Sequence, residues 1–579
     1  MRVLLLAHGF NSLTQQVFAR LRARGHVVSL ELDISDAVTQ EAVALFRPDV
    51  VIAPFLKRRI PEAVWRQHLC LVVHPGVPGD RGPSSLDRAI LRGEARWGVT
   101  VLQATGEFDA GPVWATASFA MRPATKASLY RHEVTRCALA ALSQCLRRIE
   151  RGEGAPAPLP PQPGARAWPL LRQAERAIDW SVDGTEAVLR KIRSADGSPG
   201  LADSLFGERC HLFDAHPATP QALAGALEGA PGAVVARRAN AILRRTADGG
   251  VWIGHVRRAA SANAGEGDAP LKLPATEAFA EQAAQLPELP VPLLRDAAEW
   301  DELHYAEHGE AGARVGVLRF AFYNGAMSTR QCERLRDALR ALRERPVQVL
   351  LLAGGPDFFS NGIHLNTIEA EGQAPGGSAA DASLRNIEAI DDVALEILTI
   401  TDRVTVSALC GNAGAGGVFL ALAADEVWAH PGVVLNAHYK NMGNLWGSEY
   451  WTYVLPRRLG QARAMELTQA RLPQPAADAV REGLLDACFG DDAEHFMALA
   501  LARALAMASD AGHARRIADK QALRAADEAA KPLAAYREEE LTRMRRNFYG
   551  FDPSYHVARY HFVHKLPQAW TPRHLALHR

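Results

Sequence analysis

The sequence carries no excess of charge, because 65 lysine and arginine residues balance 65 aspartate and glutamate residues. Proteins devoted to nucleic acid usually have a basic excess, since neutralising phosphates dominates their affinity. The seven cysteines include no C-x-x-C pair, the spacing typical of zinc ligands and redox pairs. We therefore predict no nucleic-acid partner, no metal site and no disulfide framework, in a reducing compartment.

Long apolar runs are also missing. No segment reaches the roughly 18 uninterrupted apolar residues that a membrane helix needs. The apolar start of the chain, Met1 to Gly9, has no signal-peptide cleavage pattern. These features predict a cytoplasmic protein without a membrane partner.

Two stretches interrupt an otherwise globular pattern. Residues 152–165 are rich in proline, which favours an extended spacer, and residues after about 259 mix Ala, Gly, Pro and Glu without alternation. We predict domains over 1–155, 166–258 and 296–579, the last with a helical C-terminal extension, and a linker over 259–295.

The first segment predicts an α/β domain with a Rossmann-like parallel sheet. Apolar strands at 2–7, 26–32, 49–54 and 69–75 alternate with helical patterns, and Ser12 to Gln15 predicts a capping box. No G-x-G-x-x-G follows the first strand, so a dinucleotide is not indicated. Ligands of such sheets bind at the carboxyl ends of the strands.

The later segments differ from each other. Residues 166–258 predict short strands of a small β-barrel. From residue 314 the α/β pattern returns, with strands at 314–322, 347–354, 404–410 and 425–430 and a capping box at Ser328 to Gln331. The part after about residue 491 is predicted to be largely helical.

A first candidate site lies at the end of the strand 69–75. His74 ends this strand before a Pro-Gly loop, and Asp109 lies in a turn after another strand. A carboxylate that orients an imidazole gives a proton-handling pair near neutral pH. Spacing alone leaves a second interpretation open, in which His74 ends a strand and Asp109 binds turn amides.

The residues around this pair resemble the 10-formyltetrahydrofolate-dependent formyltransferases. The resemblance covers about residues 1–258 and depends on HPGVPGDRGPSSLD (74–87), WGVTVLQ (97–103) and FDAG (108–111). It implies that His74 and Asp109 are the catalytic histidine and aspartate. The family asparagine two residues before the histidine is replaced by Val72, which would remove an oxyanion donor. Asn11 is either a substitute donor or a turn residue, and the formyl acceptor need not be the amine of a charged tRNA.

A second candidate site combines two glycine-rich turns, each after a strand: FFSNGIHLN (358–366) and LCGNAGAGGVFL (409–420). Backbone amides at such turns stabilise an oxyanion, and glycine permits close approach. Together the turns resemble the crotonase, or enoyl-CoA hydratase/isomerase, family over about residues 313–510. The resemblance implies a coenzyme A thioester whose carbonyl is bound by the amides of Ile363, which follows Gly362, and of Gly416.

The second site departs from the hydratases. Their two water-activating glutamates correspond to Phe419 and Tyr439, so ordinary hydration is not predicted. The stretch NAHYKNMGNLWGSEYW (436–451) supplies Tyr439 and Glu449 instead. Glu449 is either a catalytic carboxyl or a glutamate in the first turn of a helix.

The combination of both modules resembles the HypX/HoxX family of hydrogenase maturation proteins. The match includes the tail NFYGFDPSYHVARYHFVHK (547–565). It implies formyl transfer from 10-formyltetrahydrofolate to coenzyme A, decarbonylation of formyl-CoA to carbon monoxide, and delivery to hydrogenase maturation proteins. Three rivals remain open: a formyl-CoA hydrolase, a tRNA formyltransferase with an added CoA-binding domain, and a non-enzymatic scaffold.

Overall fold

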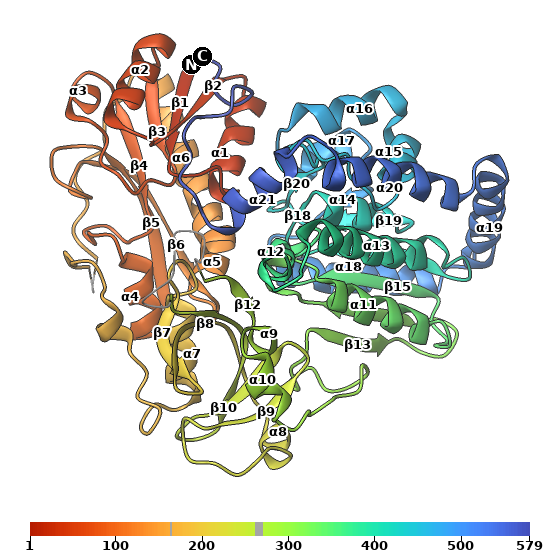
Figure 1. Cartoon of the computed structure of the whole chain (residues 1–579). Coiled ribbons are helices and arrows are strands. Elements are labelled where there is room, and N and C mark those ends of the chain that lie inside the picture. The colour runs from red at the N-terminus through yellow and green to blue at the C-terminus, as the bar shows by residue number, and fades with distance from the viewer. Residues whose placement is uncertain (163–164, 261–269) are drawn as a thin grey trace.

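The computed structural model describes residues 1–162, 165–260 and 270–579. Figure 1 shows three units: an N-terminal unit in red and orange, a middle unit in yellow, and a C-terminal unit in green and blue. The last residues of the chain return to the N-terminal unit, so that the two termini lie beside each other.

The N-terminal unit is built on a six-stranded sheet in the order β2-β1-β3-β4-β5-β6. Pairs among β1 to β4 are parallel as predicted, but β4–β5 and β5–β6 are antiparallel. The short connection between β5 and β6 accounts for the second pair, since a parallel crossover needs a dozen or more residues. The elements are β1 (Arg2–Ala7), α1 (Ser12–Ala23), β2 (Val27–Leu32), α2 (Asp36–Phe46), β3 (Val50–Ala53), α3 (Glu62–Trp65), β4 (Cys70–His74), α4 (Ser85–Arg92), β5 (Arg96–Gln103), β6 (Val113–Ala120), α5 (Lys126–Leu129), the π-helix η1 (Tyr130–Val134) and α6 (Thr135–Glu150).

The middle unit contains a largely antiparallel sheet in the order β7-β8-β11-β10-β9, with β12 beside β11. Part of the predicted linker belongs to this unit, because Ala275 and Phe279 lie in its apolar core. Residues 261–269 of that linker, and residues 163–164 of the predicted proline-rich spacer, lie outside the described residues. The elements are the 3-10 helix η2 (Gln173–Arg176), α7 (Thr185–Ser194), β7 (Leu201–Leu205), β8 (Glu208–Pro217), α8 (Pro220–Ala224), β9 (Val234–Arg238), β10 (Ala241–Arg245), β11 (Gly250–Arg258), β12 (Lys272–Pro274), α9 (Ala275–Ala278) and α10 (Ala280–Ala284).

The C-terminal unit has two sheets, in the orders β13-β14-β15-β17-β19-β22 and β16-β18-β20-β21. The predicted capping box is confirmed, with Ser328 and Gln331 at the start of α11. The elements are β13 (Leu303–His308), β14 (Val315–Phe320), η3 (Tyr323–Gly325), α11 (Thr329–Leu342), β15 (Val349–Gly354), β16 (Phe358–Ser360), α12 (Leu365–Gln373), α13 (Ala379–Leu398), β17 (Val404–Leu409), β18 (Asn412–Gly414), α14 (Gly416–Leu422), β19 (Glu426–Ala429), β20 (Val434–Asn436), α15 (Trp451–Leu459), α16 (Gln461–Ala470), β21 (Gln474–Pro475), α17 (Ala476–Arg481), β22 (Ala487–Cys488), α18 (Ala493–Ala508), α19 (His513–Ala530), α20 (Leu533–Tyr549) and α21 (Ser554–Val563).

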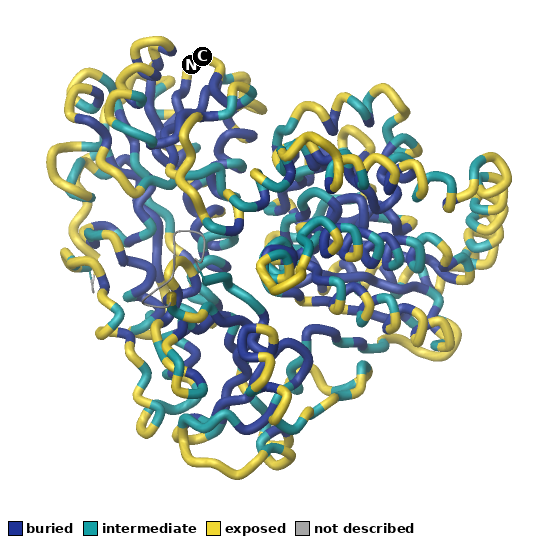
Figure 2. Tube along the Cα trace, viewed as in Figure 1, coloured by how far each residue is buried: buried dark blue, intermediate teal, exposed yellow. Residues whose placement is uncertain are grey.

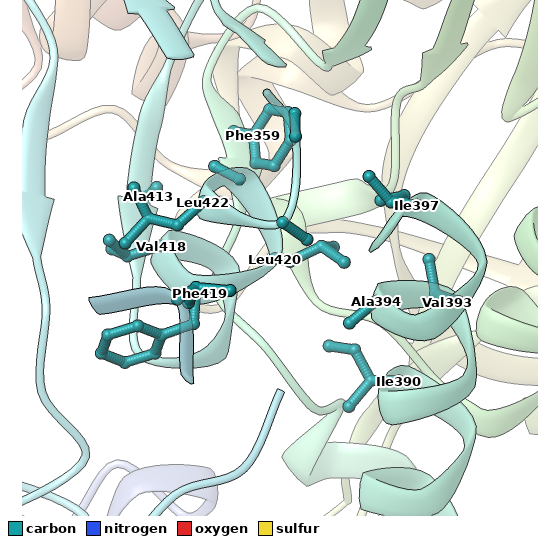
Figure 3. Packing of buried hydrophobic residues seen from close by; sticks show 14 of the residues in the cluster. Phe359, Ile390, Val393, Ala394, Ile397, Ala413, Val418, Phe419, Leu420 and Leu422 are labelled. Carbon is teal, nitrogen blue, oxygen red and sulfur yellow. The ribbon is translucent and has the colours of Figure 1, made fainter. Parts of the chain in front are cut away.

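The core of the C-terminal unit surrounds the short helix α14. All seven residues of α14 are buried, and the side chains of Leu420 and Phe419 lie in the same cluster as Ile390 and Val393 of α13 (Figure 3). Figure 2 shows this dark interior, with the largely exposed α19 projecting at the side of the unit. A helix that is apolar all round is buried, so α14 is held from every side and gives the turn before it a rigid support.

The last residues of the chain, 571–579, bind the N-terminal unit. Leu575 lies in the core of the N-terminal unit, and its carbonyl accepts the Leu30 amide at 2.9 Å. The Thr571 hydroxyl accepts the Leu32 amide at 2.9 Å. These contacts bind residues 571–579 to the outer strand β2.

Candidate functional site

The first site is centred on His74, the last residue of β4, which is only 4 % exposed. Its Nδ1 lies 3.5 Å from Asp109 Oδ1, and its Nε2 lies 3.6 Å from Asp80 Oδ2. The structure therefore brings the two predicted residues together and adds Asp80, which the sequence reasoning missed. The imidazole lies between two carboxyl groups and can exchange protons with either.

The loop geometry around His74 has a clear physical cause. A Cβ on Gly76 would collide with the His74 ring, so glycine is required where the chain turns after β4. Asp109 adopts a left-handed backbone conformation, with φ 52°, and its Oδ2 accepts the Gly82 amide at 3.1 Å. This bond joins the two loops and directs the Asp109 carboxyl at the imidazole.

Asp80 is a buried acid without a hydrogen-bond partner among the described residues. Neither of its carboxyl oxygens is bonded there, and the same holds for His74 Nε2. Buried polar atoms are usually satisfied, so such a group is expected where a ligand binds or a proton moves. The signal in the sequence was the aspartate in the P-G-D stretch of the first motif.

Asn11 is the N-cap of α1, so the predicted capping box starting at Ser12 is wrong by one residue. The Asn11 Oδ1 accepts both the amide and the hydroxyl of Thr14, each at 3.0 Å. Asparagine and serine are both favoured N-cap residues, and here the Asn11 side chain takes that position, one residue before Ser12. The Asn11 side chain also carries two N–H donors. Strand β3 lies between β1, which leads to Asn11, and β4, which carries Val72. That Asn11 substitutes for the missing asparagine at Val72 stays a prediction.

The second site lies where the two glycine turns meet. A Cβ on Gly362 would lie 3.4 Å from the Gly416 nitrogen, so the two backbones face each other. Neither the Ile363 amide nor the Gly416 amide has an acceptor among the described residues. Ala415, the N-cap of α14, has φ 48°, a strained conformation for a residue with a side chain. This strain is of the kind found at functional sites, and it lies directly before Gly416.

Tyr439 and Glu449 form a buried pair beside the Gly416 turn. The Tyr439 hydroxyl contacts Glu449 Oε2 and lies 3.0 Å from the Ser448 carbonyl oxygen. The Tyr439 ring stacks on Phe419 with centroids 5.3 Å apart. A Cβ on Gly416 would collide with the Glu449 carboxyl. The carboxyl therefore faces the predicted oxyanion turn, beside the two residues, Phe419 and Tyr439, that are predicted to replace the hydratase glutamates.

The interpretation of Glu449 as a first-turn helix residue is wrong. Helix α15 starts at Trp451, and both Glu449 and Tyr450 adopt left-handed conformations before it, with φ 58° and 57°. A residue with positive φ does not continue a right-handed helix. The Glu449 side chain is consequently free of the helix and turns inward, where the residue is 1 % exposed.

Burial dominates the proton affinities of this pair. It raises the pKa of the Glu449 carboxyl, and the charge of Asp391 raises that pKa further. Burial and the Glu449 charge likewise raise the pKa of the Tyr439 phenol well above its ordinary value. Raised pKa values favour the protonated forms, so the pair can supply as well as receive a proton.

The two sites are connected through α1. Asn412 of β18 donates to the Ser12 hydroxyl at 2.9 Å, and Asn436 of β20 donates to Gln15 at 3.1 Å. Gln16 donates to the Gly432 carbonyl at 2.6 Å. Helix α1 follows Asn11, whereas β18 leads into the Gly416 turn and β20 leads to Tyr439. The N-terminal unit thus contacts the two strands that lead to the second site through the helix that follows Asn11.

Among residues 1–162, 165–260 and 270–579, no group of three or more His, Cys, Asp or Glu side chains is placed to hold a metal ion. Of the helices in the same ranges, none has both the length and the apolar character that crossing a bilayer requires.

Comparison with protein families agrees with the geometry. Residues 2–146 match the formyl transferase family, residues 170–265 match the formyl transferase C-terminal domain, and residues 315–573 match the enoyl-CoA hydratase/isomerase family. A methionyl-tRNA formyltransferase from Paramagnetospirillum magneticum is 28% identical over 38% of this chain and 70% of its own length. The α/β fold with a formyltransferase-like N-terminal region, a crotonase-like C-terminal domain and a helical tail is thereby established.

Two relatives match the whole chain. The hydrogenase maturation factor HoxX of Bradyrhizobium diazoefficiens is 57% identical over 100% of this chain and 97% of its own. The crystal structure of HypX from Aquifex aeolicus in complex with tetrahydrofolic acid has 44% identity and a TM-score of 0.93, covering 100% of this chain and 99% of that one. Together with the two joined sites, this similarity shows that the chain belongs to the HypX/HoxX family of hydrogenase maturation factors.

Proposed function

We propose that this maturation factor synthesises carbon monoxide for the nickel–iron hydrogenase centre in two steps, from 10-formyltetrahydrofolate and with coenzyme A as carrier. One observation carries the proposal: Glu449, in contact with Tyr439, lies against the Gly416 turn. Phe419 occupies the position of a hydratase glutamate. The second site therefore combines a binding site for the thioester carbonyl with a proton donor. It has no glutamate at either position that is predicted to activate water in the hydratases.

In the first step, the coenzyme A thiolate attacks the formyl carbon carried by N10 of the folate. A C–S bond forms, the C–N bond breaks, and a proton is delivered to the departing nitrogen. His74, between Asp109 and Asp80, is the group placed to deliver that proton. The tetrahydrofolate bound by the Aquifex relative and the formyl transferase match support a folate donor.

In the second step, the amides of Ile363 and Gly416 hold the formyl oxygen. Loss of the formyl proton and protonation of the leaving sulfur convert formyl-CoA into carbon monoxide and coenzyme A. Tyr439 and Glu449 are the proton-handling groups at this turn. The contacts of α1 with β18 and β20 support transfer between neighbouring sites without release of a reactive thioester into water.

Membership of the family indicates which proteins receive the product and in which compartment. We propose that the product passes to hydrogenase maturation proteins in the cytoplasm, and that neither nucleic acid nor a membrane takes part. A tRNA acceptor is disfavoured by the balanced charge of the chain and by Val72.

Product analysis of single-site variants tests this division of labour. The purified protein is mixed with 10-formyltetrahydrofolate and coenzyme A, and formyl-CoA, formate and carbon monoxide are measured. We expect no thioester from His74→Ala, and accumulated formyl-CoA without carbon monoxide from Glu449→Gln. Formate as the only wild-type product would identify a hydrolase instead, and maturation that survives both variants in cells would identify a scaffold.

A further inference from the structure

The turn that carries Glu449 is held in an unfavourable backbone conformation. Glu449 and Tyr450 are consecutive residues with side chains, and both have left-handed φ values of 58° and 57°. Such conformations persist only where the surrounding structure holds them, and they gather at functional sites. The neighbours that hold this turn consequently decide where the Glu449 carboxyl lies.

Two fully buried carboxyl groups hold the turn. Asp391 of α13 accepts the Glu449 amide at 2.8 Å and the Ser448 hydroxyl at 2.7 Å. Glu540 of α20 accepts the Tyr450 amide at 3.0 Å. Both acids have 0 % exposure. Each left-handed residue therefore gives its backbone donor to an acid from a different helix.

The helical extension contributes further acceptors from the same face of α20. Met544 and Asn547 lie four and seven residues after Glu540, so the three side chains form a stripe along the helix. Met544 Sδ accepts the Gly447 amide at 3.2 Å, and Asn547 accepts the Trp446 amide at 3.0 Å. Helix α20 is consequently part of the framework of the second site.

The groups that face Glu449 are acids or neutral hydroxyl and thiol groups. They are Tyr439, Asp391 of α13, Glu540 of α20 and Cys332 of α11. Burial raises the pKa of all of them. The carboxylates are too close for all of them to be ionised together in a buried space, so the structure must favour one anion over the others.

Asp391 is the acid best placed to carry the charge. Glu540 also accepts hydrogen bonds, from the Tyr450 amide and from Thr452. Of the three acids, however, only Asp391 has a cation within ion-pair distance among the described residues: Arg537 Nε lies 3.8 Å from its Oδ2. The same guanidinium binds Asp392 at 2.8 Å. Glu449 has no cation among the described residues within ion-pair distance. Burial raises the pKa of Asp391, but its own hydrogen-bond donors and the guanidinium oppose that rise.

Counting hydrogens at Tyr439 leads to the same assignment. Its hydroxyl has one hydrogen and two oxygen neighbours, the Ser448 carbonyl and Glu449 Oε2. A carbonyl can only accept, so an ionised Glu449 would take the Tyr439 hydrogen and leave the Ser448 carbonyl with only the longer bond from the Trp451 amide, at 3.3 Å. If Glu449 is protonated, it donates to the Tyr439 oxygen, Tyr439 donates to Ser448, and both contacts are satisfied.

We propose that Asp391 is a positioning residue of the second site: as a carboxylate it fixes the Glu449 turn and keeps Glu449 in its neutral, proton-donating form. The assignment deepens the proposed decarbonylation and takes its chemistry from that reaction. Asp391 itself does not touch the substrate.

A neutral Glu449 fixes the order of the two proton transfers in the second step. The carboxyl proton passes to the thioester sulfur while the C–S bond breaks, and the bonding pair goes to sulfur. The resulting Glu449 carboxylate then takes the formyl proton, and the C–H pair becomes the lone pair on the carbon of carbon monoxide. The products are carbon monoxide and the coenzyme A thiol, and Glu449 regains its proton without an external acid.

Infrared titration tests the assignment independently of turnover. The carboxylic acid band of Glu449 is identified by its loss in Glu449→Gln, and is followed against pH in the wild type, Asp391→Asn and Asp392→Asn. Asparagine keeps an acceptor for the Glu449 amide but removes the charge. We expect the acid band to be present in the wild type at pH 7 and to disappear at a pH about one unit lower in Asp391→Asn.

Asp392→Asn is the matched control, because Asp392 neighbours Asp391, binds the same Arg537 and makes no contact with the turn. Its titration should follow the wild type. Carbon monoxide formation should decline with rising pH in parallel with the acid band, earlier in Asp391→Asn. An ionised Glu449 in the wild type at pH 7, or an unshifted Asp391→Asn titration, would overturn the inference. Absence of carbon monoxide in the wild type at every pH would overturn the proposed function, while the infrared titration still decides the inference.

Discussion

His74 shows how single residues define the first site. Its imidazole lies between Asp109 on Nδ1 and Asp80 on Nε2, and both contacts are longer than a good hydrogen bond. Catalytic contacts are often loose before substrate binds. Asp109 is tied to the Gly82 amide, whereas Asp80 has no partner of its own among the described residues. The two acids therefore have different freedom to respond to a substrate.

Asp109→Asn should slow formation of formyl-CoA by about 10²- to 10⁴-fold, because the neutral amide no longer stabilises a charged imidazole. The rate is measured with 10-formyltetrahydrofolate and coenzyme A. Glu107→Gln is the control, since Glu107 is an exposed neighbour paired with Arg81. An Asp109→Asn rate within twofold of the wild type would remove Asp109 from the mechanism.

Tyr439→Phe should lower carbon monoxide formation by about 10²-fold or more, because it removes the hydroxyl that contacts Glu449 and keeps the ring stacked on Phe419. Formyl-CoA formation should be unchanged. Tyr453→Phe serves as control, since Tyr453 bonds Asp527 at 2.9 Å away from the pair. Equal losses in both variants would indicate a general loss of structure.

At the residue scale, the sequence predicted which residues gather but not how they are held. His74, Asp109, Tyr439 and Glu449 were found because their motifs are local. Asp391 and Glu540 were not found. Asp391 precedes Glu449 by 58 residues, and Glu540 follows Tyr450 by 90 residues. An isolated acid in a helix predicts only an exposed position. Asp80 lies in the same local motif as His74 but was overlooked, because a loop aspartate is usually solvated.

Among the elements, α14 and the turn before it have the clearest function. The helix is buried along its whole length, and the strained Ala415 lies directly before it. The strands and capping residues of this unit were predictable, because buried parallel strands are continuous apolar runs and Ser328 to Gln331 is a local signal. The left-handed turn at 449–450 was not, since neither residue is a glycine.

Gly416→Ala should abolish carbon monoxide formation while leaving formyl transfer intact, because the added methyl group would collide with the Glu449 carboxyl. Gly355→Ala is the matched control in the same unit, where a Cβ would meet ordinary contacts at 3.5 Å and beyond. Products are compared at equal protein concentration. Normal carbon monoxide formation by Gly416→Ala would contradict the placement of Glu449 over this turn.

Across the whole molecule, residues 571–579 bind the C-terminal half to the N-terminal sheet. Glu31 of β2 is fully buried and accepts from Thr571, His578 and Arg579. Burial alone would raise the pKa of Glu31, but these hydrogen bonds outweigh it, and the net effect lowers that pKa. Long-range docking of this kind leaves no local pattern, so the sequence predicted only a helical C-terminal extension.

Glu31→Gln should destabilise the protein by about 3 kcal/mol at neutral pH, because it removes the buried charge that accepts the hydrogen bonds of Thr571, His578 and Arg579. A lowered pKa means that this stabilisation is present above the ordinary glutamate range and is lost as pH falls through the lowered value. The melting-temperature difference from the wild type should therefore shrink in acid. Glu41→Gln, which removes an exposed partner of Arg579, should cost less than about 1 kcal/mol.

The most direct test of the two-site account follows the formyl carbon through the intact protein. The chain is mixed with coenzyme A and 10-formyltetrahydrofolate labelled with ¹³C in the formyl group, and the gas is captured on reduced haemoglobin. We predict ¹³C-labelled carbon monoxide that requires coenzyme A, His74 and Tyr439. Labelled formate without carbon monoxide, or carbon monoxide that forms without coenzyme A, would contradict the account.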